Sequence, residues 1–313
     1  MPKLTFNNFL RGYGRPQYMT SHGTYSELID KATDYLKEAD YILIGAGAGL
    51  SSAAGAVYGG DWFKENFKEF RRKYGEDNPY MQDMYSAGFY PYPDEESFWG
   101  YWSKQCLLGG INLDVTPLYK KVLDIVKDKR YFVLSTNADG QFVKAGFNDA
   151  KIFCTQGDYF HIQCARACHN VIYEYSKGFK QMDEARRDCK IPKYMVPKCP
   201  VCGERMTMNL RCDDYFVEDE NWHKAESNFS MFLNEAIKSR SKICLFELGV
   251  GYNTPSIIRY PFEQMAYNNS KISLVRLNCS EAMIPTDIKN AVGINNDMAI
   301  SINDIEKKLN TKD

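Results

Sequence analysis

Short apolar runs alternate with segments of helical periodicity along this chain, and this alternation constrains the fold more than any other feature. The five clearest runs are DYILIG, RYFVLS, KIFCT, KICLFEL and KISLVRL, at residues 40–45, 130–135, 151–155, 242–248 and 271–277. Such runs are typical of strands that are buried on both faces of a parallel sheet. We expect one last strand at MAISIN, residues 298–303. The sequence therefore predicts an α/β fold.

The stretch 160–222 interrupts this alternation, because it is rich in Cys, Lys and Arg. We interpret it as an insert. The expected organisation is an N-terminal extension at 1–24, a parallel-sheet domain built from 25–60, 116–159 and 223–313, a helical lid insert at 61–115, and a four-cysteine zinc-binding module at 160–222.

Composition excludes several classes of protein. The chain has 313 residues, is 44% hydrophobic and carries a formal net charge of -1, so we expect a globular protein that binds neither nucleic acid nor membranes. No apolar run approaches the roughly 18 residues of a membrane span. The N-terminal residues lack an apolar core, which argues against a signal peptide. Without a secretion signal, the ten cysteines more often bind metal than form disulfides. We therefore expect a cytoplasmic location.

Two close pairs of cysteines predict a metal site. Cys164-x3-Cys168 and Cys199-x2-Cys202 are separated by 30 residues, and each pair suits one knuckle of a tetrahedral four-thiolate zinc site. Four thiolates leave no open position, so the expected Zn2+ is structural, one per chain. The alternatives are four unrelated buried cysteines, or competition from His169 as a ligand.

A glycine-rich turn follows the first apolar run. In ILIGAGAGLSSAAG, Gly45, Gly47 and Gly49 would let the backbone approach a pyrophosphate, and Ser51 would add a hydroxyl at the start of a helix. This pattern predicts a Rossmann-like nucleotide-binding domain beside the smaller zinc-binding and helical domain. A tight strand-to-helix turn without a ligand is the alternative. No acidic strand end follows roughly 20 residues later, so the turn does not argue for hydride transfer.

The order of these motifs resembles the sirtuins over most of the chain. The matching residues are Gly47, Ala48, Gly49, Leu50, Ser51 and Gly55 in the first turn, Ser135, Thr136, Asn137, Ala138 and Asp139 after the second strand, the four paired cysteines, and Gly249, Val250, Gly251 and Asn278 late in the chain. The resemblance implies NAD+ as co-substrate. The residues expected to bind it are Gly45, Ala46, Gly47, Ala48, Gly49, Ser51, Thr136, Asn137, Asp139, Gln156, Gly249, Gly251 and Asn278.

The chain departs from sirtuin deacylases at three places. Gln156-Gly157 stands where those enzymes carry His-Gly, AVYGGDWF replaces an Asp-Phe-Arg sequence, and DYFVED replaces Phe-Gly-Glu after the zinc module. These changes resemble the macrodomain-linked, or class M, sirtuins, whose members act as protein ADP-ribosyltransferases. The resemblance implies an acidic, lipoylated carrier protein of the glycine-cleavage H type as the acceptor.

A glutamine suits transfer better than deacylation, because it cannot serve as a general base near neutral pH. Transfer depends mainly on positioning and electrostatics. We expect Asn137 to orient ribose or water, Asp139 to hold the nicotinamide amide or stabilise positive charge, and Gln156 to hold the ribose hydroxyls. Asn137 and Asp139 could instead only cap a turn. His161 or His169 could act as a displaced base.

Other functions stay open at this point. They are an NAD-dependent protein-lysine deacylase, a degenerate NAD-binding protein without catalysis, and a zinc-ribbon nucleic-acid binder. The connection between the cysteine pairs, residues 177–198, carries seven Lys or Arg against three acids. It is either a solvated flap or a surface that steers an acidic carrier toward the cofactor cleft.

Overall fold

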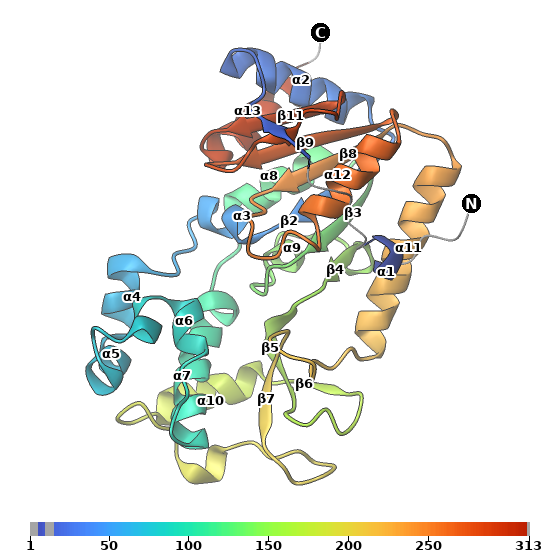
Figure 1. Cartoon of the computed structure of the whole chain (residues 1–313). Coiled ribbons are helices and arrows are strands. Elements are labelled where there is room, and N and C mark those ends of the chain that lie inside the picture. Colours follow the sequence, from blue (N-terminus) through green and yellow to red (C-terminus); the bar gives the residue numbers. More distant parts are fainter. Residues whose placement is uncertain (1–5, 10–15, 312–313) are drawn as a thin grey trace.

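The computed structural model describes residues 6–9 and 16–311 of the chain. The expected N-terminal extension at 1–24 therefore lies partly outside the described residues. Figure 1 shows a large sheet with helices on both faces and, below it, a smaller lobe of helices and short strands. No described helix combines the length and the apolarity that a membrane crossing requires.

The large sheet confirms the predicted parallel α/β fold. Its six strands are all parallel and lie in the order β11-β9-β8-β2-β3-β4. Their bounds are β2 (Tyr41–Ala46), β3 (Arg130–Ser135), β4 (Ile152–Cys154), β8 (Ile243–Leu248), β9 (Ile272–Asn278) and β11 (Ala291–Asn295). The central strands β2 and β8 are buried along their whole length, because helices cover both faces.

The prediction of a last strand at residues 298–303 was wrong. These residues begin helix α13 (Met298–Asn310), and the last strand is β11. The side chain of Asp297 accepts a hydrogen bond from the backbone N–H of Ile300 and so caps the helix. The apolar alternation in MAISIN imitates a strand over one turn only. Its buried side chains continue at helical spacing to Ile305.

Helices cover both faces of the sheet. One face packs against α2 (Tyr25–Glu38), α8 (Pro117–Val126) and α13. The other face packs against α1 (Phe6–Phe9), α11 (Glu220–Lys238) and α12 (Arg259–Asn268). Thr24 and Glu27 form a capping box at the start of α2. Helix α8 begins at Pro117, a residue that suits the first helical position.

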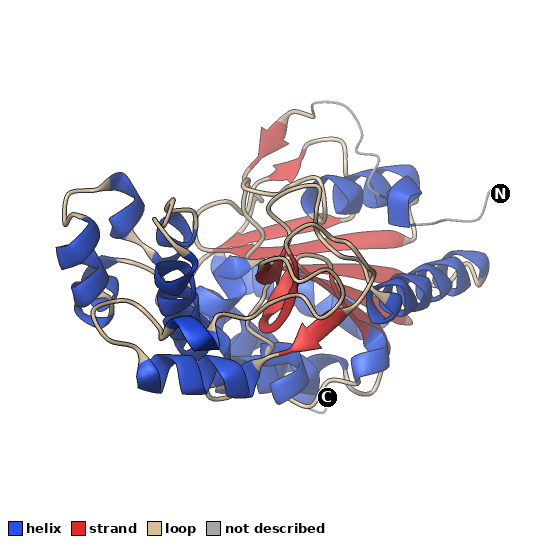
Figure 2. Cartoon of the chain, turned by 90° about the horizontal axis from the view of Figure 1, so that it is seen from below, coloured by secondary structure: helices blue, strands red, loops and turns tan. Residues whose placement is uncertain are grey.

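The smaller lobe is built around an antiparallel sheet of order β6-β5-β7. Its elements are α4 (Gly60–Asn66), α5 (Lys68–Tyr74), η1 (Pro79–Gln82), α6 (Met84–Gly88), α7 (Glu95–Cys106), η2 (Leu107–Ile111), β5 (Gly157–Cys164), β6 (Ile172–Glu174), α10 (Ser176–Ala185), η4 (Lys193–Met195) and β7 (Met206–Leu210). Figure 2 shows its helices beside this sheet and apart from the large one.

The aromatic stretch that begins at Tyr80 contributes largely to the core of this lobe. Trp99, Tyr101 and Phe179 are fully buried in one cluster that also contains Cys164. Segments 61–115 and 160–222 therefore share a single hydrophobic core. The domain boundaries themselves stay a prediction.

The remaining elements are short connections. They are β1 (Tyr18–Met19), α3 (Ala48–Ala53), α9 (Gln141–Lys144), η3 (Asp149–Lys151) and β10 (Ile284–Pro285). Strands β1 and β10 pair antiparallel in a separate two-stranded ribbon. This ribbon ties the described part of the N-terminal segment to the loop between β9 and β11.

Candidate active site

The glycine turn and the late GVG loop, which lie about 200 residues apart in sequence, meet at the carboxyl ends of β2 and β8. The backbone N–H of Gly49 donates to Gly249 O at 3.0 Å. A Cβ atom on Gly47 would lie 2.7 Å from Gly249 O, and one on Gly49 would lie 2.8 Å from Gly249 Cα. These glycines therefore permit a close backbone approach that no larger residue allows. This edge of a parallel sheet is where such folds bind nucleotides.

A second group of predicted residues gathers at the ends of β2 and β3. Asn137 Nδ2 lies 3.1 Å from Gly47 O and 3.2 Å from Ser51 Oγ, and Ser51 Oγ donates to Asp139 Oδ2 at 2.5 Å. All three side chains are buried. Thr136 lies beside them, and its backbone N–H donates to Ala46 O at 3.0 Å. The structure therefore brings the glycine turn and the STNAD segment into one polar cluster.

Tyr119 on α8 completes this cluster, and the sequence analysis did not single it out. Its hydroxyl lies 2.7 Å from Ser51 Oγ and 3.2 Å from Asn137 Nδ2. In the sequence, Tyr119 is one of several residues on the apolar face of an amphipathic helix, so nothing near it indicates a role in the site.

Burial raises the pKa of the Asp139 carboxyl above its ordinary value, although hydrogen bonds from Ser51 and the Gln141 backbone partly oppose this shift.

Gln156 occupies the turn between β4 and β5, at the same sheet edge. The backbone N–H of Thr155 donates to Ser135 O at 3.0 Å, which places the turn beside the end of β3. Gly157 has a φ of 79°, and a Cβ there would lie 1.8 Å from Asn209 O. This position therefore requires glycine. The Gln156 side chain is only partly buried, and its amide donates a 3.3 Å hydrogen bond to Thr155 Oγ1.

Arg211, which follows β7, stabilises this turn by hydrogen bonds to its backbone. The sequence analysis did not identify this residue. Its backbone N–H donates to Gln156 O at 3.0 Å, and its Nε donates to Thr155 O at 3.2 Å. The guanidinium lies over the ring of Phe216, 4.1 Å from its centroid, and pairs with Glu218 at 2.6 Å. The DYFVED segment is thus tied to the glutamine turn through one arginine.

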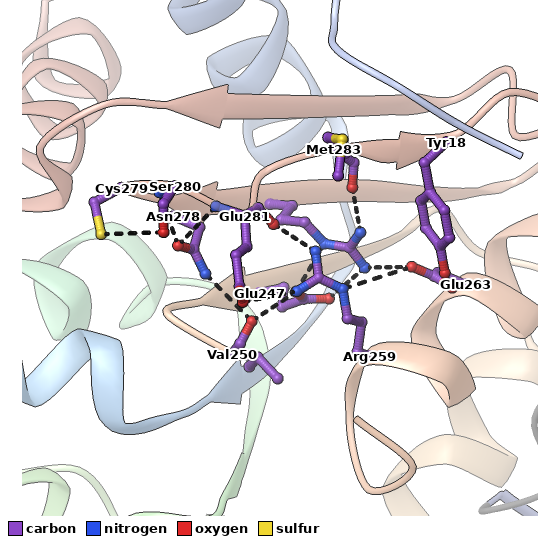
Figure 3. A network of polar contacts seen from close by, with 11 residues as sticks. Tyr18, Glu247, Val250, Arg259, Glu263, Asn278, Cys279, Ser280, Glu281 and Met283 are labelled. Atoms are coloured by element: carbon purple, nitrogen blue, oxygen red, sulfur yellow. Dashed lines mark hydrogen bonds and ion pairs between the residues drawn. The ribbon is translucent and has the colours of Figure 1, made fainter. Parts of the chain in front are cut away.

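Asn278 lies at the end of β9, as the NAD-binding prediction requires, and its amide links two loops (Figure 3). Its Oδ1 accepts from the backbone N–H groups of Ser280 and Glu281, and its Nδ2 donates to Val250 O at 3.2 Å. Gly251 follows directly in the GVG loop. Whether Asn278 also contacts a ribose stays a prediction.

A buried network of charges supports the same two loops (Figure 3). Arg259 on α12 is fully buried and donates to Val250 O at 2.9 Å and to Glu281 O. Arg276 on β9 pairs with Glu247 and Glu263. The network was not predicted, because its residues come from three elements that are distant in the sequence, β8, α12 and β9.

The paired cysteines also come together. Ligand atoms from all four lie within 4.8 Å of one another, and the four residues are Cys164, Cys168, Cys199 and Cys202. The sulfurs of Cys164 and Cys202 lie 3.7 Å apart, and those of Cys168 and Cys199 lie 3.6 Å apart. Zn–S bonds of about 2.3 Å in a tetrahedron require edges of about 3.8 Å. The cluster therefore has the dimensions of a four-thiolate metal site. His169 lies beside it, with Nδ1 3.0 Å from Cys168 Sγ.

His161 on β5 is paired with Asp158. Its Nδ1 lies 2.8 and 2.9 Å from the two carboxylate oxygens. Burial alone would lower the pKa of His161, but the hydrogen bond and charge of Asp158 outweigh burial, and Glu174 and Asp219 add to their effect. The pKa therefore lies above its ordinary value. Among the described residues, no hydrogen bond or ion pair joins this pair to Asn137 or Asp139.

Comparisons with known proteins agree with this geometry. A protein ADP-ribosyltransferase of Staphylococcus aureus (strain Mu50) is 32% identical over 265 residues, which cover 84% of this chain and 81% of that protein. A probable bifunctional ADP-ribose hydrolase/ADP-ribosyltransferase of Fusarium oxysporum f. sp. cubense is 29% identical over 265 residues. That match covers 81% of this chain but 43% of the fungal protein. No family model matches the chain.

Solved structures show the same fold. A Sir2 homologue in complex with NAD covers 94% of this chain and 96% of its own, with a TM-score of 0.52 and 15% identity. Sir2Tm bound to a propionylated peptide covers 90% of this chain and 98% of its own, with a TM-score of 0.52 and 18% identity. At such low identity these structures establish the fold alone, and the staphylococcal relative adds the family. The chain belongs to the same family as the staphylococcal protein ADP-ribosyltransferase and has the fold of the Sir2 proteins.

Proposed function

We propose that this enzyme transfers the ADP-ribosyl group of NAD+ to a protein acceptor and has negligible deacylase activity. The observation that carries this proposal is Gln156, which occupies the turn beside the STNAD cluster where sirtuin deacylases carry a histidine. A side-chain amide can hold a ribose hydroxyl but cannot take up its proton near neutral pH. The deacylation branch therefore lacks its base, while the rest of the predicted site is assembled.

The residues of the site fit a dinucleotide. The close approach of Gly47 and Gly49 to Gly249 leaves a side-chain-free cradle of backbone at the sheet edge, and this is the chemistry that a pyrophosphate requires. In this proposal these glycines, with Ala46, Ala48 and Ser51, hold the phosphates. Thr136, Gly251 and Asn278 hold the riboses. When bound, NAD+ supplies an ADP-ribosyl group with nicotinamide as the leaving group.

Three side chains of this chain would then perform the work of transfer. Asn137 orients the reacting ribose or a water, and Asp139 contacts the nicotinamide amide or stabilises positive charge that develops as the bond to nicotinamide breaks. Gln156 holds the ribose hydroxyls. The acceptor can supply its own nucleophile, particularly a carboxylate, so the enzyme mainly contributes positioning and electrostatic stabilisation.

We further propose that the four-cysteine cluster holds one structural Zn2+. The spacing of its sulfurs fits four thiolates around one ion. With all four positions filled by Cys164, Cys168, Cys199 and Cys202, the ion has no open position for a substrate. The ten cysteines of the chain are all free of disulfides, which supports a reducing compartment such as the cytoplasm.

For the acceptor we propose an acidic, lipoylated carrier protein of the glycine-cleavage H type. Support comes from the class M resemblance and from exposed cations on α10. Lys177 and Lys180 are exposed and lie three residues apart, so they share one helix face. Other basic residues of the 177–198 connection are engaged within the lobe, since Lys190 pairs with Asp94, and Lys198 pairs with Glu95 at 2.8 Å.

The deciding experiment is incubation of the enzyme with labelled NAD+ and candidate carriers, with and without lipoylation, beside an acyl-lysine peptide. We expect label on the lipoylated carrier and no deacylation of the peptide. Robust deacylation of the peptide would overturn the assignment of activity. Equal labelling of the carrier without lipoate would support the transferase activity but show that the enzyme does not recognise lipoate.

A further inference from the structure

The hydroxyl of Tyr119 lies inside the polar cluster and belongs to none of the predicted motifs. The side chain reaches in from α8, is fully buried, and packs edge-on against Phe142 with ring centroids 4.9 Å apart. Its oxygen contacts Ser51 Oγ at 2.7 Å and Asn137 Nδ2 at 3.2 Å. A buried tyrosine usually finds a hydrogen-bond partner for its hydroxyl. Here it joins two residues of the site.

The direction of each hydrogen bond follows from groups whose roles are fixed. In its ionised form the carboxylate of Asp139 can only accept, so Ser51, at 2.5 Å, donates its single proton to it. Ser51 Oγ can then only accept from Tyr119, so the Tyr119 hydroxyl donates its single proton to Ser51. The Tyr119 oxygen is left as an acceptor for Asn137 Nδ2. A one-way chain therefore runs from Asn137 through Tyr119 and Ser51 to Asp139.

The Asn137 end of this chain of hydrogen bonds is fixed as well. The backbone oxygen of Gly47 can only accept, and it lies 3.1 Å from Asn137 Nδ2. Gly47 takes one amide proton of Asn137, and the other lies between the Tyr119 hydroxyl and Ser51 Oγ, which are both 3.2 Å from Nδ2, so the amide cannot flip without losing these hydrogen bonds. No described residue donates a hydrogen bond to Asn137 Oδ1. Asn137 therefore keeps a carbonyl oxygen available to a ligand.

We propose that Tyr119 is a positioning residue for ADP-ribosyl transfer, which fixes the orientation of the Asn137 amide and couples it to Asp139 through Ser51. This inference rests on the proposed function. Tyr119 touches no reacting atom in this scheme. Its contribution is that Asn137 presents an acceptor oxygen, rather than an N–H donor, to a ribose hydroxyl or an attacking water. Tyr119 thereby holds the site in one hydrogen-bonding arrangement.

The test is Tyr119→Phe, which removes one oxygen and keeps the ring and its contact with Phe142. We expect kcat for label transfer from NAD+ to fall about 10- to 100-fold, while KM for NAD+ changes less than about threefold. The matched control is Tyr101→Phe. Tyr101 is equally buried and its hydroxyl donates to Met84 O at 2.9 Å in the smaller lobe. This control loses a comparable buried hydrogen bond, and we expect its kcat to stay within about twofold of the wild type.

Coupling separates positioning from a merely structural role. Ser51→Ala interrupts the same series of hydrogen bonds at its next residue. The double variant Ser51→Ala, Tyr119→Phe should therefore be no slower than Ser51→Ala alone. Multiplicative losses in the double variant would overturn the inference, as would a Tyr119→Phe enzyme with wild-type kcat and KM. If Tyr119→Phe melts far below the Tyr101→Phe control, its loss of rate is structural and the inference also fails.

The proposed function is judged separately, from the wild type alone. A wild-type enzyme that transfers no label overturns the proposed function and this inference with it. A normal wild type beside an equally active Tyr119→Phe variant overturns only the inference.

Discussion

Glu247 on β8 and Arg276 on β9 lie directly opposite each other in register and form two hydrogen bonds of 2.7 and 2.9 Å, with both side chains fully buried. Glu263 on α12 adds a third hydrogen bond to the same guanidinium at 2.8 Å. Two carboxylates and one arginine thus lie below the loops that carry Val250 and Asn278. Buried pairs of this kind fix geometry more than they add stability.

Arg276→Met should destabilise the protein by about 3–5 kcal/mol, because it leaves Glu247 and Glu263 buried without their shared cation. Denaturant melts measure the loss. A matched variant replaces Arg276 with Met and Glu247 with Leu and keeps Glu263, which still faces Arg259 and Tyr18. It removes the directly paired charges together and should recover much of the stability. A single variant that unfolds at the wild-type denaturant concentration would contradict the account.

Asn137→Ala should lose about a hundredfold of transfer activity while keeping the fold, because its proposed role is to position the reacting ribose. Labelled NAD+ measures transfer and thermal melting measures the fold. The control is Asn228→Ala on α11, which removes an amide that donates to Ala150 O at 3.1 Å, far from the cluster in sequence and element. Unchanged transfer in Asn137→Ala would remove this residue from the mechanism.

Cys199→Ser should release most of the metal and destabilise the smaller lobe, since a structural zinc contributes folding free energy directly. Elemental analysis of the purified protein should find about one zinc per chain in the wild type and far less in the variant. Cys212→Ser is the control, because Cys212 is exposed and lies outside the cluster. Full zinc retention in Cys199→Ser, or none in the wild type, would refute the site.

The His161–Asp158 pair should stabilise the fold in acid more than in alkali. Because the folded pKa of His161 lies above its unfolded value of about 6.5, the protonated form is favoured by folding. Its contribution is fully present below pH ~6.5 and is lost as the pH rises through the folded pKa. His161→Gln should therefore cost stability at pH 5.5, by less than about 1 kcal/mol for this partly exposed pair, and nothing well above the folded pKa. Melting temperatures across that range measure the difference, and a loss that grows with pH would contradict the sign.

The 177–198 connection offers fewer free charges for docking than its sequence indicates. Arg186 pairs with Glu69 at 2.7 Å and Asp183 at 2.8 Å, and its side chain is 12% exposed. It therefore holds the lobe together, and reversing it would test stability rather than docking. A carrier could instead meet the exposed Lys177 and Lys180 on α10.

Lys177→Glu with Lys180→Glu should slow modification of an acidic carrier several-fold at low ionic strength and leave NAD+ binding unchanged, since charge complementarity acts mainly on the association rate. The control is Lys289→Glu with Lys307→Glu, the same charge change on exposed residues of the large domain. Initial rates at two salt concentrations measure the effect. Equal slowing in both double variants would show that only net charge matters.

Local patterns predicted the parts of this protein that local physics determines. The strand that ends at Ala46 is a continuous apolar run, and the start of α2 at Thr24 is a capping sequence, so both were predictable. The cysteine knuckles were predictable because metal geometry imposes their spacing. The strand expected at residues 298–303 failed because a helix and a strand share the same apolar pattern over so short a run.

The residues that were missed act across elements. Tyr119 belongs to the cluster only because α8 packs beside the turn with Ser51, and nothing near it in sequence indicates this. The same holds for Arg186, whose partner Glu69 lies over a hundred residues away. The sequence analysis counted Arg186 among the charges of the connection, because an ion pair between two distant elements leaves no periodic pattern in the sequence.

Strand β5 (Gly157–Cys164) begins at the glutamine turn and ends at a cysteine of the knuckle. One strand of roughly 23 Å therefore runs from the glutamine turn to the cysteine cluster. With zinc in that cluster, a chelator or an oxidant that attacks the cysteines would lower transfer activity without contacting the residues at the glutamine turn. The specific activity of a preparation should then follow its zinc content, although the ion touches neither substrate.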